Sequence, residues 1–256
     1  MNNTRKFFSR FNPNTPIIIT NHQTAEMIKY ANNSFLATKI SFINQLASIC
    51  QKIPDTNIDD IAQTIGLDPR IGNLFLDAGP GYGGSCLPKD MKAIINLSSK
   101  VGVKPTMLNA VEKTNKQQIN NIIELIKQNI GKIKGKKITV LGVAFKPNTD
   151  DVRDSTSIEL IRRLIKSGAI VKIHDPKALD NARKIFRDRI KYANSIPSAL
   201  KNSQCAIIMT KWKEYERINN KAAKSMNKKF VIDTRRILSD KNLGVKYHGI
   251  GLGQKT

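Results

Sequence analysis

Apolar residues return at helical spacing through the first half of the chain. Between residues 24 and 52 they recur every three or four positions, which predicts a long helix that ends before Pro54. Four further segments show the same spacing and are predicted to be helices: 58–65, 69–76, 88–100 and 105–130. Residues 24–130 are therefore expected to form an all-helical unit.

From residue 131 onward the pattern changes to short apolar runs that alternate with amphipathic segments. The apolar runs predict buried strands at 138–141, 170–173, 205–209 and 230–232. The segments 155–166 and 178–186 predict helices between them. Strands that alternate with helices at this spacing indicate a doubly wound parallel sheet. The expected fold class is α/β, with the helical unit of residues 24–130 followed by a Rossmann-like unit over 131–256.

The composition excludes several classes of protein. Of the 256 residues, 40% are apolar and 25% are charged, as in an ordinary globular protein rather than a disordered one. No apolar run approaches the roughly 20 residues that span a bilayer, and none suits a signal peptide, so no membrane partner is expected. Three cysteines are too few for a disulfide framework, which favours a cytoplasmic location.

The net charge of +23 lies mostly in the second half of the chain. Residues 131–256 carry 29 Lys and Arg against 11 Asp and Glu, enough to attract phosphate groups. Two observations argue against nucleic acid as the partner: no run of five basic residues occurs, and no basic helix carries interleaved aromatic residues. Lys outnumbers Arg 31 to 12, as a general compositional bias would produce. We expect no nucleic-acid binding.

The glycine-rich loop 79–84 matches G-x-G-x-x-G but does not predict a dinucleotide site. That motif needs a strand before it and an acidic residue about 20 positions later. Here a helix is predicted before the loop, and no acidic residue lies between Asp90 and Glu112. The turn after the predicted strand 138–141 has one glycine of the three that the motif requires. The chain therefore contains no convincing dinucleotide fingerprint, and no metal site is expected either.

The same loop leads into a cysteine with a reactive setting. Cys86 directly precedes a predicted helix, and Lys89 lies in the first turn of that helix. Backbone amides at a helix N-terminus and a nearby cation favour the thiolate, which is the nucleophilic form. A buried cysteine on a turn explains the spacing equally well, so both interpretations stay open at this point. Cys50 and Cys205 lie in apolar surroundings and are expected to be core residues.

Five motifs together resemble one known family. The segment 79–90, with sequence GPGYGGSCLPKD, is similar to the nucleophile loop of the UDP-glucose/GDP-mannose dehydrogenase family. The segment 25–33 resembles the lysine–asparagine helix of that family. The similarity continues at 68–72, 142–155 and 233–235, in the family's order and spacing, and spans roughly residues 16–250.

The resemblance implies an activity and a set of catalytic residues. The family oxidises the primary alcohol of a sugar nucleotide to a carboxylate with two NAD, through a cysteine thioester. Cys86 corresponds to the nucleophile, and Asp90 to a carboxylate that holds or activates water. Lys29 and Asn33, four residues apart on one helix face, correspond to the pair that stabilises an oxyanion and positions water.

Binding residues carry over in the same way. Residues matching the family's substrate-binding positions are Lys29, Asn33, Arg70, Phe75, Leu76, Asp77, Ala78, Gly79, Tyr82, Gly83, Phe145, Lys146 and Arg235. Among them, Arg70 corresponds to an arginine that reaches the site of the other subunit, because the family pairs two protomers through its central domain. Lys89 and Arg153 resemble residues that touch NAD from outside its own domain. We expect a homodimer formed through the helix 105–130, whose apolar stripe has no evident partner in the sequence.

The chain departs from the family pattern in one respect. Family members begin with an NAD-binding domain that carries the glycine fingerprint, whereas residues 1–23 match only the last strand of that domain, at 17–20. The expectation is a split or truncated gene product that needs a separately encoded NAD domain. The loop resembles the UDP-glucose branch most, which predicts conversion of UDP-glucose to UDP-glucuronate. GDP-mannose as substrate, or a non-catalytic remnant that binds sugar nucleotides or dimerises, are the alternatives.

Overall fold

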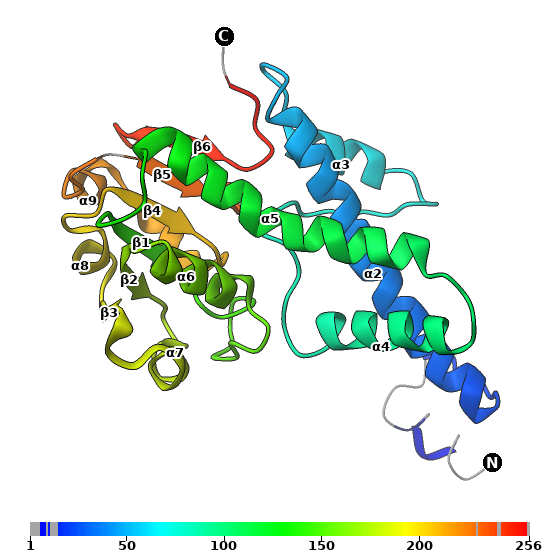
Figure 1. The fold of residues 1–256 in the computed structure, drawn as a ribbon. Coiled ribbons are helices and arrows are strands. Elements are labelled where there is room, and N and C mark those ends of the chain that lie inside the picture. The colour runs from blue at the N-terminus through cyan, green and yellow to red at the C-terminus, as the bar shows by residue number, and fades with distance from the viewer. Residues whose placement is uncertain (1–5, 9, 11–14, 229, 240–241, 255–256) are drawn as a thin grey trace.

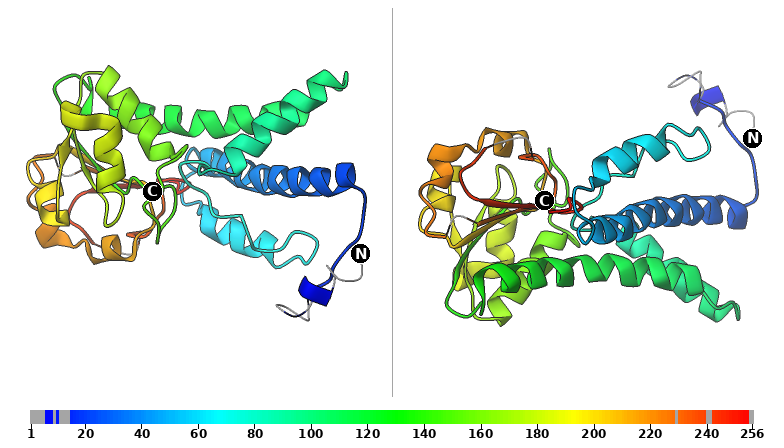
Figure 2. Two further views of the ribbon diagram at one scale, coloured as in Figure 1. Left: turned by 90° about the horizontal axis from the view of Figure 1, so that it is seen from below. Right: turned by 90° about the horizontal axis from the view of Figure 1, so that it is seen from above.

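The helical part of the chain consists of long helices packed side by side. The computed structural model describes residues 6–8, 10, 15–228, 230–239 and 242–254. The helices are α2 (His22–Cys50), α3 (Ile58–Gly66), α4 (Leu87–Lys100) and α5 (Thr106–Ile130). Helix α5 runs alongside α2, and α4 packs against both (Figures 1 and 2). The side chain of Asn21 caps the start of α2 by accepting the N–H of Thr24 at 2.8 Å.

The second part is a six-stranded parallel sheet with the strand order β3-β2-β1-β4-β5-β6. The strands are β1 (Lys137–Leu141), β2 (Ile170–His174), β3 (Lys191–Tyr192), β4 (Cys205–Ile208), β5 (Phe230–Asp233) and β6 (Lys246–Gly249). The helices between them are α6 (Thr156–Lys166), α7 (Leu179–Phe186), α8 (Ile196–Leu200) and α9 (Asn220–Ala223). This arrangement confirms the predicted doubly wound α/β class.

The helical part and the sheet share one hydrophobic core. Ile43 and Ala47 of α2 belong to the same buried cluster as Ile126 of α5 and Val140 of β1. Helix α5 also contacts α6, which packs on the sheet (Figure 1). Because apolar side chains from both parts exclude water together, the position of the glycine-rich loop relative to the sheet is set by packing.

Two predicted elements are wrong. Residues 69–76 contain turns rather than a helix, and Gly72 and Phe75 there have φ angles of 66° and 65°, outside the helical region. Residues 17–20 are not a strand, because no strand among the described residues lies beside them to complete a ladder. The rest of the predicted 1–23 segment falls partly outside the described residues. The short elements β3, β6, α8 and α9 were not predicted.

The dimer through residues 105–130 was expected because the apolar stripe of this helix had no evident partner within the chain, and this premise is wrong. The apolar stripe of α5 is buried within the chain and includes Ile119, Ile122, Ile123, Ile126 and Ile130. Its partners come from α2, α4 and α6, which sequence periodicity alone does not identify. Among the described residues, no helix is both long enough and apolar enough to cross a membrane.

Candidate active site

Helix α2 brings two polar side chains to one buried carboxylate. The ammonium of Lys29 lies 3.0 Å from a carboxylate oxygen of Asp90, in the first turn of α4. One turn later on α2, the side-chain amide of Asn33 donates to the same oxygen, Asp90 Oδ2, at 2.6 Å. Asp90 is fully buried. The three predicted residues therefore form one hydrogen-bonded cluster.

The charges of this cluster stabilise one another. Burial acts to raise the pKa of Asp90, but hydrogen bonds from Lys29 and Asn33 and the positive charges of Lys29 and Lys89 outweigh it, so the pKa is lowered. The hydrogen bond to Asp90 is the largest influence on Lys29, and the pKa of that lysine is raised. Both groups are therefore ionised near neutral pH.

Cys86 lies one helical turn from Asp90, at the N-terminus of α4. Its backbone carbonyl accepts the Asp90 N–H at 2.9 Å, and its thiol lies 3.8 Å from the hydroxyl of Ser85. The cysteine is exposed, so the alternative of a buried residue on a turn is wrong. Cys50 and Cys205 are buried, which confirms them as core residues. The pKa of Arg153 is raised mainly by its hydrogen bonds to Asp151, as that of Lys29 is raised by Asp90.

Backbone hydrogen bonds from three other segments hold the loop that carries Cys86. The N–H of Gly79 donates to the side chain of Asn44 on α2 at 2.7 Å. Asn115 on α5 accepts the Tyr82 N–H at 2.8 Å and donates to the Tyr82 carbonyl at 3.1 Å. Gly84 donates to the carbonyl of Arg153 at 3.1 Å. Sequence analysis missed Asn44 and Asn115, because their partners are 33 or more residues away.

Replacing Gly81 with alanine is expected to destabilise the protein by about 1–3 kcal/mol more than replacing Gly102 with alanine. Both glycines have positive φ angles, 99° and 78°, so both variants carry the backbone penalty. A Cβ at position 81 would lie 2.5 Å from Asn115 Oδ1, whereas at 102 it would meet no atom within 4 Å. Urea unfolding measures the difference, and equal losses for the two variants would refute the close fit of the loop against α5.

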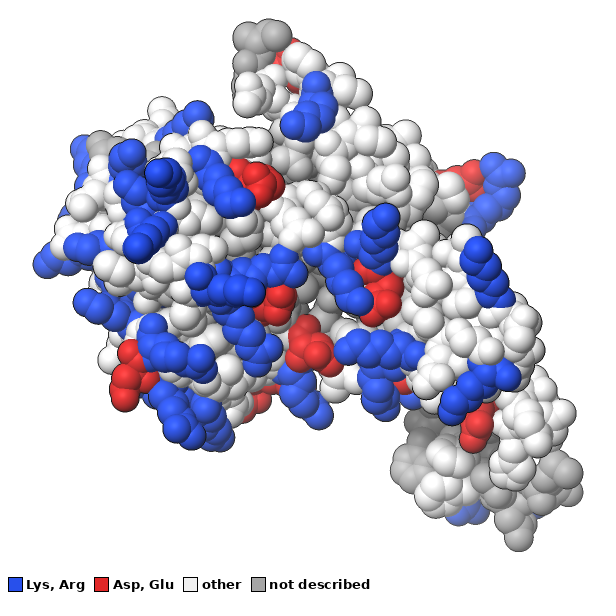
Figure 3. All heavy atoms as spheres, viewed as in Figure 1, with Lys and Arg blue, Asp and Glu red and all other residues white. Residues whose placement is uncertain are grey.

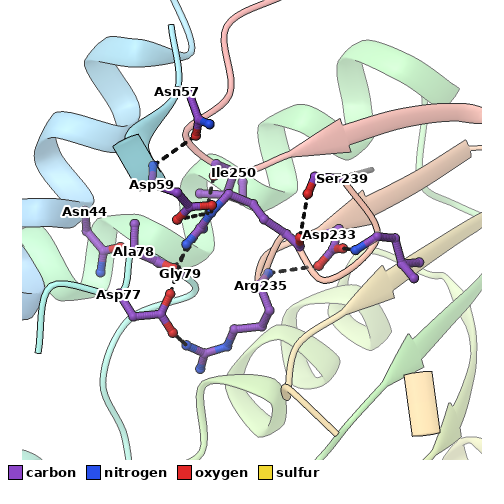
Figure 4. Close-up of polar contacts among 12 residues, drawn as sticks. Asn44, Asn57, Asp59, Asp77, Ala78, Gly79, Asp233, Arg235, Ser239 and Ile250 are labelled. Atoms are coloured by element: carbon purple, nitrogen blue, oxygen red, sulfur yellow. Dashed lines mark hydrogen bonds and ion pairs between the residues drawn. The ribbon is translucent and has the colours of Figure 1, made fainter. Parts of the chain in front are cut away.

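The predicted nucleotide-binding residues lie at the carboxyl ends of the strands. Arg235 follows β5 and points toward Asp77, with 4.0 Å between guanidinium and carboxylate (Figure 4). Its Nε donates to the carbonyl of Met209 at 3.0 Å. A Cβ on Gly79 would lie 2.8 Å from this guanidinium and 3.2 Å from the carbonyl oxygen of Thr234, so a larger residue would have to displace the arginine side chain. Lys146 lies over the ring of Phe145, 5.4 Å from its centroid.

Other predicted binding residues are placed differently. Arg70 is exposed and forms an ion pair with Asp68 at 2.6 Å. Leu76 and Ala78 are buried in the hydrophobic core, so they can offer a ligand only their backbone. Gly83 packs so closely on the backbone of Asp154 that a Cβ would lie 2.4 Å from its carbonyl oxygen. Lys89 extends its ammonium to 3.8 Å from Asp90.

Sequence profiles of known families match most of this chain. The central domain of the UDP-glucose/GDP-mannose dehydrogenase family matches residues 23–117, and the UDP binding domain of the same family matches residues 139–240. The chain belongs to the UDP-glucose/GDP-mannose dehydrogenase family. The earlier resemblance is thereby confirmed at the level of the family.

Relatives within this family are similar along nearly the whole chain. The chain is 42% identical to the UDP-glucose 6-dehydrogenase of Rickettsia felis over 240 residues, covering 91% of this chain and 53% of that protein. It is 43% identical to the UDP-glucose 6-dehydrogenase AglM of Haloferax volcanii, covering 93% and 54%. A solved UDP-glucose dehydrogenase from Pyrobaculum islandicum superposes with a TM-score of 0.88 at 32% identity, covering 98% and 57%. The chain thus spans about half the length of these relatives.

Arg236 joins the helical part of this dehydrogenase family member to the sheet. The sequence did not identify this residue. The guanidinium of Arg236 is almost fully buried and donates to Asp59 at 2.8 and 2.9 Å and to Asp77 at 2.9 Å. It also donates to the carbonyls of Ala78 at 2.9 Å and Ile250 at 3.2 Å. Figure 4 shows that Asp59 and Asp77 approach from the helical part. Arg236 follows the recognised Arg235, but only folding reveals these distant partners.

The sheet itself does not suit a dinucleotide diphosphate. In nucleotide-binding sheets of this type, the backbone N–H groups after the first strand bind the phosphates. Here the N–H groups of Val143 and Ala144 donate instead to Asp175 Oδ2 at 2.7 and 3.0 Å, and the indole of Trp212 donates to the same oxygen at 3.1 Å. A buried carboxylate of the chain already satisfies these donors, in agreement with the missing glycine fingerprint.

Proposed function

We propose that this chain provides the catalytic cysteine and the nucleotide-sugar site of a UDP-glucose 6-dehydrogenase. The observation that carries the proposal is the exposed Cys86 at a helix N-terminus, one turn from the Lys29–Asn33–Asp90 cluster. Relatives at 42% and 43% identity are UDP-glucose 6-dehydrogenases, which supports this substrate. In this proposal residues 24–130 act as the central domain and residues 131–256 as the UDP-sugar domain.

The residues suit oxidation of an alcohol to an acid in two stages. After the alcohol has become an aldehyde, the Cys86 thiolate adds to the carbonyl carbon and forms a thiohemiacetal. The cation of Lys29 and the amide of Asn33 stabilise the oxygen on which negative charge develops. A second oxidation gives a thioester, and water held by Asp90 hydrolyses it to the carboxylate and the free thiol.

When bound, NAD would accept the hydrides, two for each sugar that is oxidised to the acid. Lys89, whose ammonium lies 3.8 Å from Asp90, and Arg153, which pairs with Asp151 at 2.7 Å, are the cations that we propose to meet the negative charge of a dinucleotide diphosphate. Because Asp175 satisfies the N–H groups after β1, this sheet is not proposed to hold the cofactor. Lys89 and Arg153 would orient the reactive end of NAD, and turnover requires a dinucleotide-binding domain of the family type.

The nucleotide-sugar part of the proposal predicts selective binding. Arg235, Lys146 and the backbone of the 75–79 segment line the expected site of the uracil nucleotide. Calorimetry on this chain is expected to show weak, saturable binding of UDP-glucose and UDP, with hardly any binding of NAD. Tighter binding of GDP-mannose would favour the alternative substrate, and NAD binding as tight as UDP would overturn the assignment of the sheet.

The dimer that we propose uses α2 rather than α5. Four apolar residues on α2 stand seven positions apart and are all about half exposed: Ile28, Phe35, Phe42 and Ile49. A seven-residue spacing places them along one stripe of the helix, the pattern of paired helices. Arg70 is exposed and pairs with Asp68, two residues before it, rather than with a predicted site residue, which suits an arginine that serves a second copy of this chain.

Replacing Phe35 and Phe42 with aspartate is expected to convert the dimer to a monomer in sedimentation at micromolar concentration, because two buried charges would face the partner helix. Met107→Asp, at an equally exposed apolar position at the start of α5, is the matched control and should leave the dimer intact. A monomeric parent chain would contradict the proposal.

A further inference from the structure

Four lysines surround a small cavity at the amino ends of the strands. Lys137 and Lys191 are the first residues of β1 and β3, whereas the proposed nucleotide site at Arg235 follows the carboxyl end of β5. The cavity, about 160 Å³ in volume, therefore lies at the opposite ends of the strands from the proposed nucleotide site. Its other two lysines are Lys172 and Lys201, and no acidic side chain lines it. Figure 3 shows how densely lysine and arginine cover this part of the molecule.

The strand register forces two of these lysines together. Lys172 of β2 stands directly opposite Lys191 of β3 and next to Thr139 of β1. Like charges at opposite positions of neighbouring strands are destabilising. Within the chain as the structure describes it, none of the four cavity lysines forms an ion pair. Among the described residues, no acidic side chain therefore compensates this repulsion.

The central lysine is fixed in place. The half-buried Lys172 donates its ammonium to the carbonyls of Ser198 at 2.8 Å and Lys201 at 3.1 Å, at the end of α8. An ammonium has three N–H groups, so one remains for a ligand. Burial, and then the charges of Lys191, Lys137 and Lys201, lower the pKa of Lys172. A negative ion in the cavity would offset the repulsion between the lysines and would stabilise the charged form of Lys172.

We propose that this cavity binds a compact oxyanion of the phosphate or diphosphate class, held by Lys137, Lys191 and Lys201 together with the fixed ammonium of Lys172. The hydroxyl of Ser203 and the amide of Asn202 also line the cavity and offer further polar contacts. A volume of about 160 Å³ suits a compact ion better than a whole nucleotide. The ligand is either a free ion or the phosphate end of a larger molecule whose remainder lies outside.

Calorimetry of the whole chain with pyrophosphate, inorganic phosphate and glucose 1-phosphate at constant ionic strength tests the site. One saturable site is expected for pyrophosphate, and Lys191→Gln and Lys201→Gln should each weaken it about tenfold, the loss of one charge-assisted contact. Lys172 is left unchanged, because it also caps α8. If glucose 1-phosphate binds as tightly as inorganic phosphate, the site accepts the phosphate end of a larger molecule. If inorganic phosphate binds and glucose 1-phosphate does not, the ligand is a free ion.

Two matched variants separate this site from others. Lys104→Gln removes one exposed positive charge from the helical part, between α4 and α5, and Arg235→Gln removes one at the proposed nucleotide site; both should change pyrophosphate affinity less than about twofold. Equal weakening by Lys104→Gln would reveal general charge attraction and overturn the proposal. Loss of binding in Arg235→Gln but not in Lys191→Gln would place the ion at the nucleotide site and overturn it too. Neither outcome depends on whether Cys86 is catalytic.

Discussion

Cys86→Ser is expected to lower UDP-glucuronate production by about a thousandfold or more when an NAD-binding domain of a relative is fused before Pro16. The thioester route needs a thiolate at this position, and a serine hydroxyl ionises far less readily. The first oxidation does not chemically require the thiol. An ester on the serine oxygen hydrolyses more slowly than a thioester, so mass spectrometry is expected to detect a covalent sugar adduct.

Two buried cysteines provide the controls for this experiment. Cys50→Ser and Cys205→Ser should change the free energy of unfolding by about 1–3 kcal/mol as core substitutions and leave the ratio of NADH to UDP-glucose intact. The measurement is NADH formed per UDP-glucose for each of the three variants. Acid formation by Cys86→Ser at the rate of the parent would refute the proposed mechanism.

Arg236→Met is expected to lower the free energy of unfolding by about 3 kcal/mol, measured by urea denaturation. The buried guanidinium satisfies two carboxylates and the carbonyls of Ala78 and Ile250, and an apolar side chain of similar length satisfies none of them. Asp59 and Asp77 are about half exposed and keep part of their hydration, which places the loss at the low end for a broken buried ion pair.

An exposed ion pair gives the comparison for Arg236. Lys127 lies 2.8 Å from Glu124 on the surface of α5, and Lys127→Gln should cost no more than about 0.5 kcal/mol. The loss in free energy of unfolding for Arg236→Lys should lie between those of Arg236→Met and Lys127→Gln, because an ammonium keeps the charge but cannot reach partners in so many directions. If Arg236→Met unfolds within 1 kcal/mol of the parent, the two parts of the chain are joined mainly by their shared apolar core.

The regular elements of this protein were largely predictable, and their failures have local causes. The long helices and the strands β1, β2, β4 and β5 follow from periodicity, because each buries one face or is buried on both. The segment 69–76 has apolar residues at helical intervals, but Gly72 and Phe75 adopt left-handed backbone angles there. The strand β3 has only two residues, too few for any pattern to indicate.

The candidate site was predictable only in part. Lys29 and Asn33 share a helix face by their spacing, and Cys86 and Asp90 are a turn apart, so each pair follows from the sequence. That the two pairs meet depends on the packing of α4 on α2, which is decided by apolar contacts among residues far apart in the chain. The same holds for Asn115, whose role as a clamp on Tyr82 has no signature in the sequence.

The sequence by itself determined the fold class and the family and supplied the proposal for the chemically active side chains, because periodicity and motifs are local properties of the chain. Only the tertiary structure decided that the stripe of α5 is buried while that of α2 is exposed. It also decided that Arg236 joins the helical part to the sheet and that four lysines surround one cavity. These features depend on contacts between residues up to 177 positions apart, and such contacts exist only once the shared core has brought the elements together.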